Sequence, residues 1–304
     1  MAASKVMPRK AHRSSVRGGE FRFIATVLVP TTIFYVLFRL YPLAYAFYMS
    51  LHDWKLLRVQ QTFVGLKNYQ TILNDPLFIK VVGNTFYFAI AATVLGTIVA
   101  LYLAILINPI ERGSTVLRLL YFLPVMTSTI AIATVWLWLY QTRFGLFNAL
   151  LTMIGLPRIP WLQSPDWAMP SIILMSVWAG VGFTMIIFLA GLRGIPRSFY
   201  EAAEIDGATT LQQVRYITIP LLAPVTAFVV VTGLIGGFNV FQQVFLMTRG
   251  GPLDSTRTLA LHIYDYAFLR LFMGTAASMA FVMFALVIAM TFVQLRIQRT
   301  EWEF

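Results

Sequence analysis

Long apolar stretches separated by polar segments dominate this chain of 304 residues. Six stretches have the length, about twenty residues, that an α-helix needs to cross a bilayer, and their interiors are almost free of charge. They cover residues 23–41, 84–108, 117–140, 170–190, 221–242 and 275–295. The pattern predicts an all-α, polytopic membrane protein with six transmembrane helices.

Two charges fall inside these predicted spans, and prolines interrupt the first and third. Arg118 lies in the third span, and Arg39 lies near the end of the first, where its side chain is expected to reach the headgroups. Pro30 and Pro124 predict bends in the first and third spans, because proline cannot complete the hydrogen-bond ladder of a helix.

The composition agrees with a membrane protein. Hydrophobic residues make up 59% of the chain and charged residues 12%, against about 45–50% and about 25% in soluble domains. So few charges cannot cover a soluble surface, which excludes a soluble enzyme, a disordered chain and a disulfide scaffold. The chain contains no cysteine, which removes thiol catalysis and cysteine-based zinc sites.

The first span follows a basic tail over residues 1–22, with Lys5, Arg9, Lys10, Arg13, Arg17 and Arg22. A cleaved signal peptide is the competing interpretation, but the apolar run is long and no small-residue cleavage site follows it. We therefore expect an uncleaved first helix and a cytoplasmic N-terminal tail.

The net charge of +11 would suggest nucleic-acid binding in a soluble protein. In a membrane protein it indicates orientation, because basic residues gather on the cytoplasmic side. Six crossings from a cytoplasmic N-terminus place the C-terminus inside as well, and basic residues are then denser inside than outside. We expect both termini in the cytoplasm and no nucleic-acid partner.

Three segments are expected outside the membrane, over residues 42–83, 141–169 and 243–274. Turn residues and aromatic residues alternate in them, which predicts short amphipathic helices across the outer mouth. Their tryptophans, Trp54, Trp161 and Trp167, are better explained as interfacial anchors than as ligand-stacking residues.

The sequence contains none of the common catalytic or nucleotide-binding motifs. It has no phosphate-binding loop, dinucleotide fingerprint, zinc-protease motif or nucleophile elbow. The three histidines, His12, His52 and His262, are scattered, so we expect no metal site. The span interiors hold no Asp, Glu or Lys, although ATP-independent carriers and proton pumps usually need such residues. A carrier, a channel and an intramembrane enzyme are therefore disfavoured, and any driving force is expected to lie outside this chain.

The segment 191–220 differs from the other loops. Ser198 with Glu201 and Thr210 with Gln213 predict two helix-opening capping boxes, and Gly207 predicts the end of the first helix. The second helix is expected to run through Tyr216 and end near Pro220. Anionic headgroups would repel the acidic residues of the first helix. This favours docking of that helix to another protein over lying on the membrane. These acids are Glu201, Glu204 and Asp206, beside the small residues Ala202, Ala203 and Ala208.

At this point the sequence resembles a known family. Glu201-Ala202-Ala203, Gly207 and Ile217-x-Ile219-Pro220 are similar to the "EAA" motif of ABC-importer permeases, E-A-A-x3-G-x9-I-x-L-P, with Ile219 in place of Leu. Phe63-Val64-Gly65-Leu66-x-Asn68-Tyr69 and Leu246-Met247-Thr248-Arg249-Gly250-Gly251-Pro252 resemble carbohydrate importers of the maltose, trehalose and glycerol-3-phosphate class. Within a permease pair, the latter stretch looks like the "F" or "A" partner.

The resemblance implies a type I ABC importer transmembrane domain over residues 23–304, in a bacterial or archaeal plasma membrane. Family members act with a second homologous permease, two ATPase subunits and an extracytoplasmic substrate-binding protein. This chain would then be a non-catalytic subunit without a cofactor of its own, because ATP and Mg belong to the ATPase. The coupling residues implied are Glu201, Ala202, Ala203, Glu204, Asp206, Gly207 and Pro220.

Polar side chains within the predicted spans are candidates for the substrate pathway. The predicted fifth span ends with Phe238, Asn239, Phe241, Gln242 and Gln243, whose amides can bond sugar hydroxyls as donor and acceptor. Contacts between helices explain the amides equally well. The glycines mark either close helix packing, for which Gly233 and Gly237 have the spacing, or a break in the helix. Trp136, Trp138, Tyr140 and Trp178 are weaker pathway candidates.

An uncharged pathway favours a mono- or oligosaccharide as the solute. A phosphorylated solute would need Arg or Lys at depth, which the partner permease could supply. Glycerol 3-phosphate or a glycerophosphodiester therefore stays open as the alternative.

Overall fold

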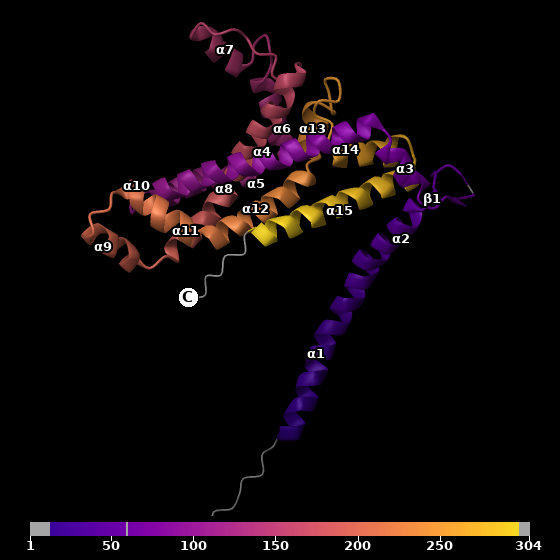
Figure 1. The fold of residues 1–304 in the computed structure, drawn as a ribbon, viewed down its shortest axis with the longest axis horizontal. Helices are drawn as coiled ribbons and strands as arrows, with labels where there is room; N and C mark the ends of the chain where they lie inside the picture. The colour runs from indigo at the N-terminus through magenta and orange to yellow at the C-terminus, as the bar shows by residue number, and fades with distance from the viewer. Residues whose placement is uncertain (1–12, 59, 298–304) are drawn as a thin grey trace, which may run out of the picture.

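The computed structural model describes residues 13–58 and 60–297 (Figure 1). Part of the predicted tail, residues 1–12, lies outside the described residues. The helices are α1 (Arg13–Tyr35), α2 (Tyr41–Ser50), α3 (Lys67–Leu73), α4 (Pro76–Ile107), α5 (Ser114–Met126), α6 (Thr129–Leu139), α7 (Leu146–Met153), α8 (Pro165–Arg193), α9 (Arg197–Ile205), α10 (Thr210–Gln213), α11 (Ile219–Leu221), α12 (Ala223–Phe238), α13 (Gln242–Met247), α14 (Leu259–Tyr264) and α15 (Met273–Ile297).

Three π-helical turns join helices, over Val36–Leu40, Val214–Thr218 and Asp265–Leu269. The two strands, β1 (His52–Asp53) and β2 (Thr62–Phe63), form a short antiparallel pair with His52 opposite Phe63. The protein is otherwise helical within the described residues, as the sequence predicts.

Four helical segments of the described chain are long and apolar enough to cross a membrane: Phe23–Ser50, Pro76–Ile107, Pro165–Arg193 and Met273–Arg296. Two bent helix pairs, α5 with α6 and α10–α11 with α12, bring the number to six if each pair counts as one span. The number agrees with the prediction, although several spans are longer than expected. The second span, for example, begins at Pro76 rather than at residue 84.

The first span differs most from its prediction. The helix begins at Arg13 and continues past residue 41 to Ser50, so Arg39 lies within it rather than near its end. Pro42 does not stop the helix, because the preceding π-turn lets the Tyr41 amide donate to the Val36 carbonyl and so shifts the hydrogen-bond register.

The third and fifth predicted spans are bent. The pair α5–α6 bends by 97° at Thr127 and Ser128, three residues beyond Pro124. The pair α10–α11 and α12 bends by 65° near Leu222. A second π-turn precedes Pro220, so the helix does not end there and runs to Leu221.

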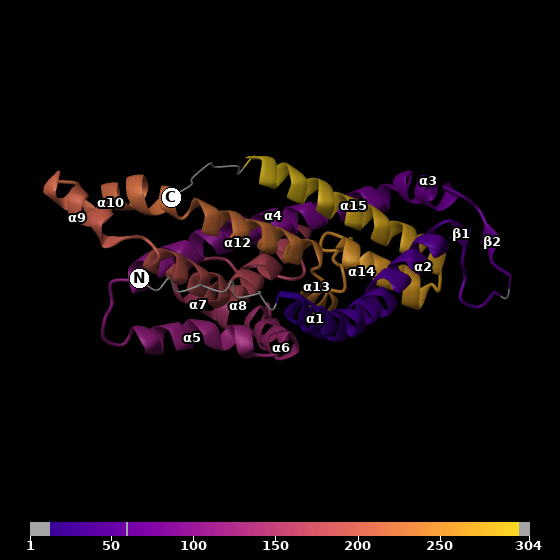
Figure 2. The same cartoon turned by 90° about the horizontal axis from the view of Figure 1, so that it is seen from below.

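Helix α4 forms the centre of the bundle and packs against α8 and α12 (Figure 2). Small residues permit this close packing. A Cβ atom added to Gly237 would lie 2.6 Å from the Ala89 Cα atom, and one added to Gly233 would lie 2.9 Å from the Thr93 Cγ2 atom. These two glycines therefore serve helix packing, one of the two roles left open by the sequence.

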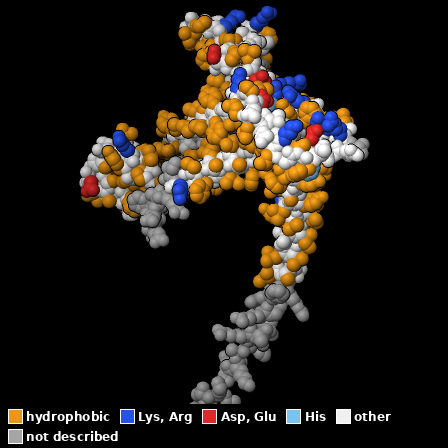
Figure 3. All heavy atoms as spheres, turned by 45° about the vertical axis from the view of Figure 1, so that its right-hand side comes forward, with side chains coloured by type: hydrophobic (Ala, Val, Ile, Leu, Met, Phe, Trp, Pro, Cys, Tyr) orange, Lys and Arg blue, Asp and Glu red, His pale blue; other side chains and the backbone are white. Residues whose placement is uncertain are grey.

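The surface matches a membrane-embedded protein. Charged side chains gather towards the ends of the molecule, whereas its flanks are hydrophobic (Figure 3). Helix α1 projects away from the bundle (Figure 1), and the apolar window of the first span is 0% buried within the chain. The segment α9–α10 lies at the opposite end from α3, β1 and β2 (Figure 2).

Short helices occur in each segment predicted to lie outside, namely α3, α7, α13 and α14. The indole of Trp161 packs against Tyr140 and Phe147 and donates a hydrogen bond to the Asn148 side chain. These internal contacts hold the Trp161 side chain in place, and its role as an interfacial anchor stays a prediction.

Candidate functional site

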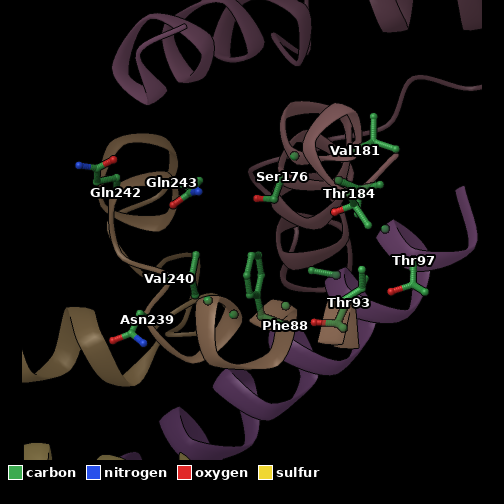
Figure 4. A pocket seen from close by; sticks show the side chains of 18 of the residues that line it. Phe88, Thr93, Thr97, Ser176, Val181, Thr184, Asn239, Val240, Gln242 and Gln243 are labelled. Atoms are coloured by element: carbon green, nitrogen blue, oxygen red, sulfur yellow. The ribbon is translucent and has the colours of Figure 1, made fainter. Parts of the chain in front are cut away.

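A cavity of about 570 Å³ opens between α4, α8, α12 and α13 (Figure 4). We call it the central cavity. None of the described residues that line it is charged. Its polar groups are hydroxyls of α4 and α8 and amides that follow α12: Thr93, Thr97, Ser176, Thr184, Asn239, Gln242 and Gln243. The cavity therefore offers neutral hydrogen-bonding groups on otherwise apolar walls.

The hydroxyl residues were missed by the sequence analysis. Ser176, Gly180 and Thr184 recur at intervals of four residues on α8 and so share one helix face. Thr93 and Thr97 repeat the pattern on α4. Small polar residues at helical spacing within an apolar span are the sequence pattern that could have identified this wall of the cavity.

The Oγ1 atoms of Thr93 and Thr97 are buried and make no hydrogen bond within the described residues. Most buried hydroxyls in proteins are paired, so two unpaired oxygens on neighbouring turns of α4 are unusual, and their residues line one wall of the cavity. In Figure 4 their oxygens lie on the opposite side of the cavity from Gln243.

The side of the cavity that carries the amides is formed by a break between two helices. Helix α12 ends at Phe238, and α13 begins only at Gln242, so the predicted fifth span is broken before its end. Gln243 faces Ser176 across the cavity, whereas the amide of Gln242 points away (Figure 4). The side-chain amide of Asn239 donates to the Ile235 carbonyl at 2.8 Å, so a local contact occupies part of its capacity.

Phe238 does not line the central cavity. Its side chain is 0% exposed and packs edge-on against Phe86, with ring centroids 4.9 Å apart. Its helical position turns it into the core, so the cavity does not include this predicted pathway residue. Phe241 does line the cavity, together with Phe88, whose ring points into the space (Figure 4).

The segment 191–220 forms two short helices with a turn between them. Gly207 has a φ of +76°, a conformation that glycine adopts at little cost. The Gly207 amide donates to the Glu204 carbonyl and the Ala208 amide to the Ala203 carbonyl, which is the Schellman pattern of a helix C-terminus. Gly207 ends the first helix as predicted.

Neither capping box lies where it was predicted. Helix α9 begins at Arg197 after Pro196 and has no side-chain cap, so Ser198 and Glu201 do not form a box. The box of α10 consists of Thr209 and Gln212. Adjacent threonines compete for the capping position, which explains the shift of one residue.

Exposed residues cover the outward face of α9 and its turn. Glu201, Ala202, Glu204, Asp206 and Gly207 are exposed, Ala203 is half-buried, and Pro220 is exposed farther along the segment. Two apolar side chains stand out beside them, Ile205 at 87% and Leu211 at 77% exposure. Acidic and apolar groups thus lie together on a projecting end of the molecule, a composition suited to binding another protein.

Glu201 and Glu204 also line a hollow of about 570 Å³ with Arg193 and Arg197. The Tyr200 hydroxyl lies 3.0 Å from that of Thr218 and so links α9 to the segment that leads into α12. This contact ties the projecting helix to a wall of the central cavity.

At the other end of the molecule, a polar latch holds the loop 250–258 against α4. Asn84 donates to the carbonyls of Asp254 and Arg257, and Lys80 to that of Leu253. Arg257 forms ion pairs with Asp254 and Asp265. Burial lowers the pKa of Arg257, but these carboxylates raise it by more, so that the net shift is upward and the guanidinium stays charged.

His262 lies beside this latch on α14. Its ring is buried, and neither nitrogen makes a hydrogen bond within the described residues. Burial, followed by the positive charges of Arg257 and Arg270, lowers its pKa to about 4. The ring is therefore neutral at ordinary pH. No group of three or more metal-ligating side chains occurs in the part of the chain that the structure describes.

Comparisons with known proteins agree with this architecture. Residues 92–301 match the family model described as "Binding-protein-dependent transport system inner membrane component". The trehalose/maltose transport system permease protein MalF of Thermococcus litoralis is 32% identical over 286 residues, 94% of this chain and 97% of that protein. The sn-glycerol-3-phosphate transport system permease protein UgpA of Escherichia coli is 33% identical over 279 residues, 90% and 94% of the two chains.

A solved structure has the same fold. It is a bacterial alginate ABC transporter in complex with an alginate pentasaccharide-bound periplasmic protein, and its matching chain is 23% identical with a TM-score of 0.81. The match covers 95% of this chain and 98% of the other.

Proposed function

This chain belongs to the family of inner membrane components of binding-protein-dependent transport systems, and from that membership we propose that it is a permease subunit of an ATP-driven saccharide importer. With a second, homologous permease it would form the pathway for a mono- or oligosaccharide delivered by an extracytoplasmic binding protein. The observation that carries the proposal is the uncharged central cavity, with its hydroxyls, amides and two aromatic rings.

The chemistry of the cavity matches a neutral sugar. Hydroxyl and amide groups both donate and accept hydrogen bonds, as a sugar hydroxyl requires. The rings of Phe88 and Phe241 supply flat apolar surfaces for the faces of a sugar ring. A phosphorylated solute such as sn-glycerol 3-phosphate, named for the Escherichia coli relative, would need a cation from the second permease.

The coupling to ATP is proposed for the segment 191–220. Helix α9 would seat in a cleft of the ATPase subunit, which binds ATP and Mg, and the residues involved would be Glu201, Ala202, Ala203, Glu204, Asp206, Gly207 and Pro220. Two observations support this role: its acidic and apolar groups are exposed at one end of the molecule, and Tyr200 links it to the segment leading into α12. This chain would hydrolyse nothing.

The orientation follows from the same assignment. The end that carries α9 and α10 would face the cytoplasm, together with both chain termini, and the end that carries α3, β1 and β2 would face outward. The unburied apolar window of the first span supports a further contact, either with lipid or with the second permease.

Replacing Gln243 with Leu should test the central cavity. Loss of one hydrogen bond costs about 0.5–1.5 kcal/mol, so we expect the KM for uptake of a transported sugar to rise roughly two- to tenfold. Uptake is measured in proteoliposomes that contain the complete importer. The panel of radiolabelled solutes is glucose, trehalose, maltose and sn-glycerol 3-phosphate.

Gln70→Leu is the matched control, because Gln70 is exposed on α3 and does not line the cavity. The affinity of the isolated binding protein should be the same in both assemblies. An unchanged KM for Gln243→Leu would assign Gln243 to helix packing. Uptake of sn-glycerol 3-phosphate alone would replace the saccharide with the phosphorylated alternative.

A further inference from the structure

A second cavity, of about 560 Å³, lies beyond the far end of α13 from the central cavity. Its walls come from the end of α6, the following turn, residues 162 and 163, and the end of α13 with the loop after it. The lining residues are Leu137, Tyr140, Gln141, Thr142, Leu162, Gln163, Met247, Thr248, Gly251 and Pro252. None of them is charged.

Helix α13 connects the two cavities. Its first residues, Gln242 and Gln243, line the central cavity, and its last residue, Met247, lines the second. A helix of six residues is about 9 Å long. The two cavities therefore lie about this distance apart along α13.

The walls of the second cavity are held in place by internal contacts. The Tyr140 hydroxyl donates to the Ser171 carbonyl at 2.8 Å, and the Tyr140 side chain is buried. On the opposite wall, the hydroxyls of Thr248 and Thr256 lie 2.7 Å apart, and Thr256 donates to the Gly251 carbonyl. The cavity is therefore preformed rather than a gap between loose side chains.

Two side-chain amides in this cavity retain unused hydrogen-bond donors. The Gln163 Oε1 atom accepts a bond from the Thr142 hydroxyl, and the Gln141 Oε1 atom accepts one from the Arg143 amide. The NH₂ group of neither glutamine donates to any of the described residues. Gln141 is half-buried and Gln163 is exposed. Their unpaired donors, beside the apolar surfaces of Leu137, Leu162 and Met247, suit a ligand with both hydroxyl groups and apolar ring faces.

We propose that the second cavity is a saccharide subsite, which the solute occupies before it reaches the central cavity. The inference rests on the proposed function, because it takes the same neutral saccharide as the ligand. Gln141 and Gln163 donate to its hydroxyls, and the apolar side chains of Leu137, Leu162 and Met247 contact its apolar faces. Specificity is then set at two places along this chain.

The absence of cysteine from the chain makes accessibility measurements direct. Single cysteines replace Gln141 or Gln163 in the second cavity, Gln243 in the central cavity, and Thr152, which is exposed on α7 outside both. Each variant is assembled with cysteine-free partner subunits in proteoliposomes. The rate of modification by a charged methanethiosulfonate is measured with and without the sugar of the panel (glucose, trehalose or maltose) that the proteoliposomes take up.

We expect the sugar-loaded binding protein to slow modification several-fold at Gln141→Cys, Gln163→Cys and Gln243→Cys and to leave Thr152→Cys unchanged. Two positions in the second cavity guard against a variant that fails to assemble. Protection at Gln243→Cys alone would overturn the subsite and leave the proposed function standing.

Three other results would also overturn the inference. Equal protection of Thr152→Cys would indicate a general change of conformation. Equal protection by the sugar-free binding protein would identify a protein segment as the occupant. If no saccharide of the panel is taken up, the proposed function fails, and the subsite fails with it.

Discussion

At the scale of single residues, Gly236 and Gly237 are neighbours with opposite environments. A Cβ atom at Gly237 would lie 2.6 Å from the backbone of α4 at Ala89, whereas one at Gly236 would meet nothing within 4 Å. We expect Gly237→Ala to destabilise the protein by about 1–3 kcal/mol, the usual cost of overpacking.

Gly236→Ala should be neutral or slightly stabilising, because alanine favours helix over glycine. The thermal unfolding midpoints of the two purified variants, compared with that of the wild type, check this pair. Equal midpoints for both variants would contradict the close contact between α12 and α4.

His262 predicts a dependence of stability on pH. The pKa of its buried ring is lowered to about 4 from the ordinary 6.5, so the unfolded chain binds a proton more readily than the folded one. The contribution of the neutral ring to the free energy of unfolding is fully present above about pH 6.5 and is lost as the pH falls through about 4. Arg257 and Arg270 disfavour the charged ring, while Asp75 and Asp265 oppose them less strongly.

The thermal unfolding midpoint of the wild type should therefore fall more than that of His262→Phe as the pH is lowered from about 7.5 to about 5. Phenylalanine matches the aromatic neighbours Phe78 and Tyr266 and cannot be protonated. Parallel declines in the two proteins would assign the acid sensitivity to other groups.

At the scale of elements, Gly207 decides the shape of the segment 191–220. Its φ of +76° strains any side chain branched at Cβ, whereas asparagine tolerates it. We expect Gly207→Val to shift α9 and strongly reduce ATP-coupled uptake, and Gly207→Asn to retain most of it. Uptake and binding-protein-stimulated ATP hydrolysis are measured together, with the amount of assembled complex as the control.

Wild-type coupling in Gly207→Val would remove α9 from the route between ATP hydrolysis and transport. Failure of both variants to assemble would instead assign Gly207 to folding, which also contradicts the proposed role of the turn.

The lengths of the apolar stretches predicted the number of membrane spans but not where the spans bend or end. Four spans and two bent pairs agree with six apolar stretches, because burial in lipid depends on composition. The extension of the first helix to Ser50 was missed, since the sequence Tyr41-Pro42 predicts a stop and a π-turn accommodates it. Such register shifts depend on local backbone geometry that proline alone does not reveal.

The central cavity was predicted only in part. Four of the five residues expected on the pathway line it, while Phe238 faces the core. The amides lie at the break between α12 and α13. The glycines before them left a break open as one interpretation of the sequence but did not give its position. The hydroxyls of α4 and α8 come from helices distant in sequence, so their convergence depends on tertiary packing.

At the scale of the whole molecule, the chain combines an uncharged cavity, a projecting acidic helix and apolar flanks. Its described part holds no metal-ligating cluster, and the sequence has no nucleotide-binding motif. The central claim is that this chain supplies a saccharide pathway whose driving force is ATP hydrolysed by other subunits.

ATP-dependent uptake of a radiolabelled saccharide into proteoliposomes tests this claim most directly. The complete assembly holds this chain, a second permease, two ATPase subunits and the sugar-loaded binding protein. We expect uptake that requires ATP on the ATPase side, that disappears when this chain is omitted, and that Glu201→Lys abolishes without loss of assembly. Uptake by this chain alone without ATP, or undiminished uptake in its absence, would contradict the account.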